Sequence, residues 1–202
     1  MKIVFASKNE GKVKEIRSMF EKMNIELVSL NEYKNVPQIM EDGNSFQENA
    51  LKKARIISEF TGETVLADDS GLEVDALEGE PGIYSSRYAG ESANDEDNNK
   101  KLLAMLKNVP LEKRTACFIC MLVLYKKDGT FNCYEGRWCG QIIDKGRGKN
   151  GFGYDPIFWL PELKMTAAEL PAEIKNKVSH RGQAFSHLRH SLIELVKQSD
   201  GA

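Results

Sequence analysis

The stretch Val65-Leu66-Ala67-Asp68-Asp69-Ser70-Gly71-Leu72-Glu73-Val74-Asp75-Ala76-Leu77 places an apolar run directly before two acids, a hydroxyl and a glycine. Residues 65–67 lack the polar alternation of a half-exposed strand, which predicts a strand buried on both faces of a mixed or parallel sheet. The carboxylates are expected at the end of this strand. Burying an unpaired carboxylate costs on the order of several kcal/mol, so a cation should lie close by, and hard divalent ions prefer such oxygens. Alternatively, the two acids cap a turn opened by Ser70-Gly71.

The composition narrows the class of protein. A chain of 202 residues with 41% hydrophobic residues can bury one core, which favours one domain or a domain with a lobe. The formal net charge of -2 argues against a general nucleic-acid binder. The apolar run at the N-terminus, residues 1–7, is too short for a secretory segment or a membrane span. We therefore expect a cytoplasmic enzyme with neither nucleic acid nor membrane as a partner.

The N-terminal segment has the order expected of a phosphate site. Ile3 to Ala6 reads as a strand, Ser7 to Lys12 as a polar loop, and Val13 to Lys22 as an amphipathic helix that Asn9 can cap. A helix N-terminus offers free N–H groups and a partial positive charge, to which Lys8 and Lys12 add full charges. The Walker A spacing is missing, so an ordinary strand-to-helix loop is the alternative.

Further elements alternate between strand and helix. Glu26 to Leu30 reads as a strand, and a helix follows the capping-box pattern Ser45-Phe46-Gln47-Glu48 and ends at Thr61-Gly62. Asp95 to Leu106 is predicted to be helical. Arg114 to Tyr125 and Thr130 to Trp138, joined through Asp128-Gly129, predict a β-hairpin that forms a second, antiparallel lobe. Together these patterns predict an α/β fold.

The cysteines are expected to be free thiols. Cys117 and Cys120 have C-x-x-C spacing, but they lie in a β-forming run, where residues three apart point to opposite faces and cannot grip one ion. Cys133 and Cys139 form no second close pair. Buried or half-buried thiols are therefore expected, as in a reducing compartment.

The C-terminal third carries a second candidate site. The glycine-rich loop of residues 146–156 could approach a ligand closely, and Phe152 and Tyr154 could offer a ring to a base, although both could equally belong to the core. Ser179 is the expected N-cap of a terminal helix, with His180 and Arg181 in its first turn. Because cations there oppose the helix dipole, they suggest a ligand rich in acceptors.

Six segments in order resemble the inosine triphosphate pyrophosphatase family. They are residues 6–12 (ASKNEGK), 48–50 (ENA), 67–72 (ADDSGL), 82–87 (GIYSSR), 151–158 (GFGYDPIF) and 179–184 (SHRGQA). The resemblance implies an α/β fold with a long central mixed sheet flanked by helices, in one domain spanning 1–202. Its lobes would be roughly 1–110 plus 160–202, and 111–159, with a cleft between them. It also implies a homodimer and Mg²⁺-dependent hydrolysis of ITP, dITP and XTP to monophosphate and pyrophosphate, which would cleanse the nucleotide pool.

The resemblance also implies roles for individual residues. Asp69 would be the general base and, with Glu41, a metal ligand, and Ser70 would touch the substrate. The phosphates would be held by Ser7, Lys8, Asn9, Glu10, Gly11 and Lys12. The base and the remaining phosphate or sugar contacts would fall to Phe152, Gly153, Tyr154, Asp155, Lys175, His180 and Arg181.

Elementary chemistry agrees with this assignment. Phosphoryl hydrolysis needs a metal, cationic and N–H donors, and a base that orients water. Arg181, with His180, is expected to favour 6-oxo purines, which present O6 and N7 as acceptors, over adenine, which presents an amine. Two alternatives remain: a nucleotide-binding sensor without turnover, and a nucleotide phosphatase that releases orthophosphate.

Overall fold

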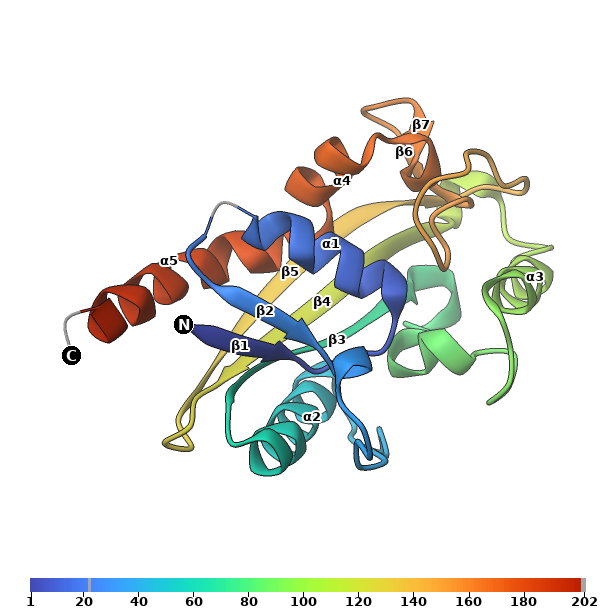
Figure 1. Cartoon of the computed structure of the whole chain (residues 1–202). Helices are drawn as coiled ribbons and strands as arrows, with labels where there is room; N and C mark the ends of the chain where they lie inside the picture. The colour runs from blue at the N-terminus through green and yellow to red at the C-terminus, as the bar shows by residue number, and fades with distance from the viewer. Residues whose placement is uncertain (22, 201–202) are drawn as a thin grey trace. The chain divides into compact units, whose positions relative to one another are not determined.

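A computed structural model describes residues 1–21 and 23–200, with side chains described up to residue 196. Its seven-stranded sheet has the order β2-β1-β3-β4-β5-β6-β7 (Figure 1). The strands are β1 (Lys2–Phe5), β2 (Glu26–Ser29), β3 (Thr64–Val74), β4 (Thr115–Tyr125), β5 (Phe131–Ile142), β6 (Phe158–Leu160) and β7 (Met165–Thr166). β1 pairs in parallel with β2 and β3, whereas β6 pairs antiparallel with β5 and β7. The predicted mixed α/β sheet is thereby confirmed.

The helices are α1 (Glu10–Phe20), α2 (Phe46–Thr61), α3 (Asp95–Met105), α4 (Ala172–Val178) and α5 (His180–Asp200). The predicted caps Asn9 and Ser45 each accept a hydrogen bond from the third backbone N–H of their helix, and Gly62 ends α2 in the left-handed conformation. The predicted start of the first helix at Val13 was wrong. Because Asn9 caps directly, Gly11 and Lys12 belong to the first turn of α1.

The chain divides into two compact units. The first contains Met1–Asp69, Cys120–Gly136 and Arg181–Ala202, and the second contains Ser70–Ile119 and Arg137–His180. These boundaries differ from the predicted lobes, 1–110 plus 160–202 and 111–159. The difference arises because β3, β4 and β5 are long enough for each to contribute residues to both units.

The core of the first unit explains why its helices form. Ile3, Phe5 and Leu66 of the parallel strands pack in one cluster with Ile16 of α1 and Leu188 of α5. All five side chains are buried. In Figure 1, α2 lies on the other side of β1 and β3 from α1. Since neighbouring strand residues point to opposite faces, each face of this part of the sheet is covered by helix.

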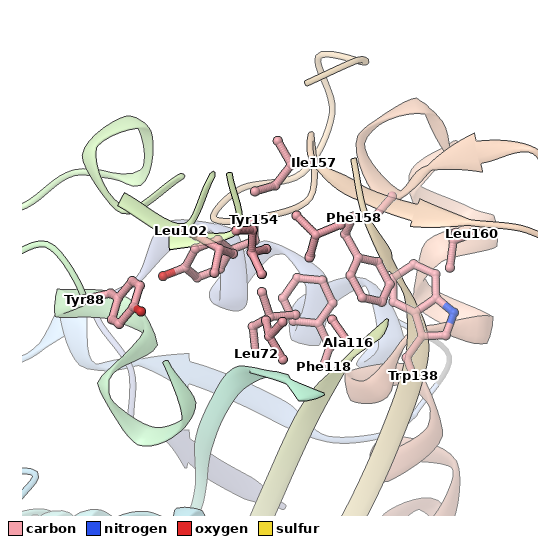
Figure 2. Close-up of a cluster of buried hydrophobic side chains, with 14 of the residues drawn as sticks. Leu72, Tyr88, Leu102, Ala116, Phe118, Trp138, Tyr154, Ile157, Phe158 and Leu160 are labelled. Atoms are coloured by element: carbon pink, nitrogen blue, oxygen red, sulfur yellow. The ribbon is translucent and has the colours of Figure 1, made fainter. Parts of the chain in front are cut away.

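The second unit has a core rich in aromatic rings. Phe118 of β4 stacks on Trp138 of β5 and lies 4.6 Å, centroid to centroid, from Phe158 of β6 (Figure 2). Leu72 of β3 and Leu102 of α3 are buried in the same cluster. Figure 2 also shows Tyr154 within this group of side chains, next to Leu102.

One prediction about the cysteines was wrong. Cys117 and Cys139 form a disulfide between β4 and β5, across a Cα–Cα distance of 4.0 Å. The hairpin brings them together: Lys126 N–H bonds Thr130 O across the turn, and Cys117 precedes Lys126 by as many residues as Cys139 follows Thr130. Cys120 and Cys133 are free thiols, the former buried, as predicted. Among the described residues, no helix is both long and apolar enough to cross a membrane.

Candidate functional site

Asp68 and Asp69 lie within β3 rather than at its end. The strand continues to Val74 because Leu72 and Val74, two residues apart, are both fully buried in the core of the second unit. The predictions of a strand end, and of a turn capped by the two acids, were therefore wrong. The partner strand β1 does stop there, since its last pair is Phe5 with Leu66. The acids follow directly after the carboxyl end of that parallel pair.

Being adjacent in a strand, the two carboxylates point to opposite faces of the sheet. Asp68 shares the face of Leu66, which packs against α1 and α5. Asp69 shares the opposite face, where it meets Lys53 of α2. The Coulomb repulsion expected between adjacent acids is thus relieved by separation, and each acid has cations of its own.

Asp68 is the centre of a buried ion-pair network. Its Oδ2 accepts a hydrogen bond from Arg181 Nε at 2.8 Å, and its Oδ1 pairs with the ammonium of Lys12. Cys120 Sγ lies 3.4 Å from Oδ2. Burial alone would raise the pKa of Asp68, but the charges of Arg181 and Lys12 outweigh it and hold that pKa well below its usual value. Asp68 is therefore a buried carboxylate whose two cationic partners favour its charged form.

Arg181 is built into the same network. Its side chain is 1% exposed, and its Nη1 also donates to Glu15 Oε2 of α1 at 2.5 Å. Two carboxylates therefore balance a cation in the first turn of α5, where the sequence pointed to an external ligand. Direct reading of a purine by Arg181 stays a prediction, and it would require these bonds to be exchanged.

On the opposite face, Asp69 and Glu41 meet at one ammonium. Lys53 Nζ lies 3.0 Å from Asp69 Oδ1, 2.7 Å from Glu41 Oε1 and 2.8 Å from the backbone oxygen of Asp68. Burial would lower the pKa of Lys53, but Asp69 and Glu41 reverse this and raise it. Burial raises the pKa of Asp69, against the opposing charges of Lys53 and Lys12. The expectation that a cation lies near the acids is confirmed, and Glu41 and Asp69 share one ammonium. Their role as metal ligands stays a prediction.

The donor set fits a magnesium ion only if a ligand completes it. Asp69 Oδ2 is buried and, among the described residues, has no hydrogen-bond partner, so an acceptor oxygen is left over. Within the part of the chain that is described, no three His, Cys, Asp or Glu side chains gather as a metal cage. Mg²⁺ is commonly held by one or two carboxylates together with water and substrate phosphates. Glu41 and Asp69 match that pattern.

The N-terminus of α1 supplies hydrogen-bond donors in the first unit, which also contains Glu41, Lys53 and Asp69. Asn9 Oδ1 accepts the N–H of Lys12, and the N–H of Asn9 donates to Ser7 Oγ, which fixes the turn before the helix. The N–H groups of Glu10 and Gly11 point out of the helix end, because an α-helix offers its first N–H groups no partner of its own. Lys8 is exposed. The Glu10 carboxylate accepts from the Asn31 side chain, so this acid supports the local fold.

In the second unit, residues 146–156 form the glycine-rich loop that we call the Phe152 loop. A buried carboxylate, that of Asp155, holds it together. Asp155 Oδ2 accepts the N–H of Phe152 at 2.9 Å and pairs with Lys175 Nζ at 2.5 Å. That ammonium lies 4.9 Å from the centre of the Phe152 ring. A Cβ added at Gly151 would fall 1.9 Å from Asp155 Oδ2, so the loop needs glycine there for close approach. Phe152 is half-buried, and its ring has an ammonium beside it.

Tyr154 and His180 belong to the packing of the second unit. The Tyr154 hydroxyl donates to Ser85 O at 2.8 Å, and burial raises the pKa of Tyr154. Of the two interpretations offered for Tyr154, a ring for a base or a core residue, the structure supports the core residue. The His180 ring is 4% exposed and stacks on Phe118 at 4.8 Å, centroid to centroid. Ser70 follows Asp69 in β3 and is half-buried.

The sequence analysis missed three features of these two charge clusters. It did not name Lys53 or Glu15, and it did not separate the role of Asp68 from that of Asp69. A signal for Lys53 was present. It lies three residues after Ala50 and four before Ile57, on the buried face of α2, where a lysine requires carboxylate partners. Glu15 carries no comparable signal, because its partner is 166 positions away.

Comparisons with known proteins cover nearly the whole chain. The model of the Ham1 family matches residues 3–191. The dITP/XTP pyrophosphatase of Geobacter sulfurreducens is 49% identical over 95% of this chain and 96% of its own, and that of Desulforamulus reducens is 50% identical over 96% and 97%. A HAM1 protein from Coxiella burnetii superimposes with a TM-score of 0.87, at 42% identity over 96% of this chain and 99% of its own. The nucleoside-triphosphatase / dITP/XTP pyrophosphatase of Mycobacterium abscessus superimposes with a TM-score of 0.75. It is 45% identical over 93% of this chain and 98% of its own.

Proposed function

This chain belongs to the Ham1 family, and from that premise we propose that it hydrolyses dITP, ITP and XTP to the nucleoside monophosphate and pyrophosphate. The observation that carries the proposal is the Glu41–Lys53–Asp69 cluster, in which Lys53 and Asp69 are buried and one Asp69 oxygen is left over. It occurs in a chain that is 50% identical to a dITP/XTP pyrophosphatase over nearly its full length.

Asp69 is the proposed general base. Its buried Oδ2 can take a proton from a water molecule whose oxygen forms the new bond to the α-phosphorus, while the bond from that phosphorus to the bridging oxygen breaks and pyrophosphate leaves. Lys53 orients the carboxylate through Oδ1. A bound Mg²⁺, held by Glu41 and Asp69, would neutralise phosphate charge. The nucleotide polyphosphate is placed by the N–H groups at the start of α1 with Ser7, Lys8 and Lys12.

Base selection is assigned to the second unit. A base stacked on Phe152 gains roughly 1 to 3 kcal/mol. Lys175, whose ammonium lies 4.9 Å from that ring, offers a donor to the O6 and N7 acceptors of hypoxanthine and xanthine. Adenine would present an amine to this ammonium, and a mismatched polar pair of this kind discriminates more strongly than an apolar pocket does. Ser70, Gly153, Asp155 and His180 are proposed to support these contacts. A homodimer is proposed from the resemblance.

The deciding experiment is a panel of ITP, dITP, XTP, GTP and ATP with Mg²⁺, with product identification. We expect high kcat/KM for the first three, low values for GTP and ATP, and monophosphate with pyrophosphate as products. GTP presents the same O6 and N7 as ITP, so its exclusion is expected to act at its 2-amino group, near residues 152–155. Chelation should abolish turnover and Mg²⁺ should restore it. Orthophosphate as the product would establish the phosphatase alternative, and binding without turnover would establish the sensor. Equal kcat/KM for ATP and ITP would contradict the account of base selection.

Lys12→Ala is expected to raise the KM for ITP about tenfold or more, because a charged hydrogen bond to phosphate is lost, while the Kd of inosine stays unchanged. Lys12 also pairs with buried Asp68, so the variant is expected to be less stable than wild type, and both values are measured well below its unfolding temperature. Lys12 is 16% exposed in its side chain, so rising salt should shrink the difference only in part. Steady-state kinetics and calorimetric titration provide the two values. The matched control is Lys14→Ala, an exposed lysine on the same helix. Equal weakening of nucleoside and triphosphate would refute the phosphate contact.

A further inference from the structure

Helix α3 holds the Phe152 loop at one residue. The N–H of Gly153 donates to Asp95 Oδ2 at 2.6 Å, and the backbone oxygen of Gly153 accepts from Asn99 Nδ2 at 3.0 Å. Asp95 and Asn99 are four residues apart, so they lie on one face of the helix. Both backbone polar groups of Gly153 are therefore bonded by side chains of a single helix. We call Asp95 and Asn99, with these two hydrogen bonds, the clamp.

These two hydrogen bonds act at a position that steric crowding does not fix. Gly153 has φ of +61°, and a Cβ added there would meet nothing within 4 Å, so its conformation is not set by crowding. The preceding N–H, of Phe152, is taken by Asp155. Two successive N–H groups of the loop are thus bonded by carboxylates, one from the loop itself (Asp155) and one from α3 (Asp95). With its N–H groups used in this way, the loop is better suited to present a ring than to bind phosphate.

The clamp also borders open space. A groove of about 480 Å³ in the second unit is lined by Asp95, Asn99, Phe152 and Gly153, among others. This volume lies in the range of small-molecule sites. The clamp residues and the ring that they position therefore face the same groove. Asn99 Oδ1 is buried without a partner among the described residues, so only the amide nitrogen of this side chain holds the loop.

We propose that Asp95 and Asn99 are positioning residues that hold Phe152 in the orientation in which it receives the purine. The inference rests on the proposed function, since Phe152 is the proposed platform for the base. Neither side chain needs to touch the reacting phosphate. Their loss should weaken the binding of substrate and of transition state alike.

Asp95→Ala and Asn99→Ala are each expected to raise the KM for ITP about threefold to tenfold, the cost of one hydrogen bond, with kcat unchanged. Asp97→Ala is the matched control for KM. Asp97 is an exposed acid in the first turn of the same helix, its side chain accepts the Asn94 N–H, and it is not among the residues that line the groove. Its removal therefore corrects for the helix dipole. Glu96 is 76% exposed and pairs with Lys100, but both line the groove, so Glu96→Ala serves as the control only where no substrate is present. An unchanged KM in both clamp variants would overturn the proposal.

The clamp can be tested without substrate. In the ligand-free protein, Asp95→Ala should speed hydrogen exchange at the amide of Gly153, and the Glu96→Ala control should not. Asp95→Asn keeps an acceptor oxygen and should retain most of the protection and a nearly normal KM. Should Asp95→Asn be as impaired as Asp95→Ala, or should exchange at Gly153 stay unchanged, the assignment is wrong.

The double variant separates this inference from the proposed function. Because both side chains act on Gly153, the combined rise in KM should be smaller than the product of the single effects. Independent, multiplying effects would show that no common clamp exists. If the wild-type enzyme hydrolyses none of the triphosphates, the proposed function fails while the exchange measurements still decide whether α3 holds the loop.

Discussion

Replacing Asp69 with asparagine is expected to lower kcat for ITP by about 10² to 10⁴-fold, the typical contribution of a general base, while nucleotide binding persists. Asparagine keeps the shape and an oxygen that can still accept from Lys53, but it removes the charge and the ability to take a proton. Steady-state kinetics give kcat, and calorimetric titration with a non-hydrolysable triphosphate analogue gives Kd.

Asp42→Asn is the matched control for this change. Asp42 lies next to Glu41, is exposed, and pairs with Lys52 of the same helix that carries Lys53. The substitution removes the same charge one residue away from the proposed site and should leave kcat close to wild type. If Asp69→Asn retained more than about a tenth of wild-type kcat, Asp69 would not be the base.

Arg181→Leu is expected to lower the free energy of unfolding by about 3 to 5 kcal/mol, because it leaves Asp68 buried with half of its counter-charge. The side chains of Arg181 and Asp68 are 1% and 0% exposed. Urea unfolding, with the slope checked for constancy, measures the change.

The control for this prediction is Arg17→Leu on α1. Arg17 pairs with Glu32 at 2.6 Å, but both side chains are about half exposed, at 52% and 51%. Exposed pairs contribute about 0 to 1 kcal/mol, so this variant should be nearly as stable as wild type. Similar losses in the two variants would contradict the role of Arg181 as a buried anchor.

Local chemistry made part of the fold predictable. Ser45 and Gly62 mark the ends of α2 through hydrogen bonds within a few residues, and Asp128-Gly129 marks the hairpin, so these elements were predicted close to their true positions. Asn9 was recognised as a cap, but the start of α1 was placed three residues too late. The continuation of β3 beyond Ala67 was missed, because Asp68 and Asp69 read as a strand end when their partners are unknown. Those partners, Arg181 and Lys53, are supplied by distant helices.

In the candidate site, too, local patterns could be predicted from the sequence and distant partners could not. The acids at 68 and 69 and the start of α1 were singled out from the residues themselves, whereas Glu41 and the individual roles came from the resemblance. In the structure, Glu41 and Asp69 share Lys53. The division of labour between Asp68 and Asp69 depends on which face each carboxylate takes, and that follows from strand geometry rather than from residue type. The disulfide was within reach, since the Asp-Gly turn that was recognised sets the register that pairs Cys117 with Cys139.

The opposite orientation of Asp68 and Asp69 limits how this part of the chain can evolve. Inserting or deleting one residue in β3 before the pair would exchange their faces, so that each acid would meet the other's partners and both the buried ion pairs of Asp68 and the proposed base would be lost together. A change of two residues would preserve the alternation. Natural variation in length should therefore accumulate in the loops and turns, whereas the stretch between Thr64 and Asp69 should keep its length.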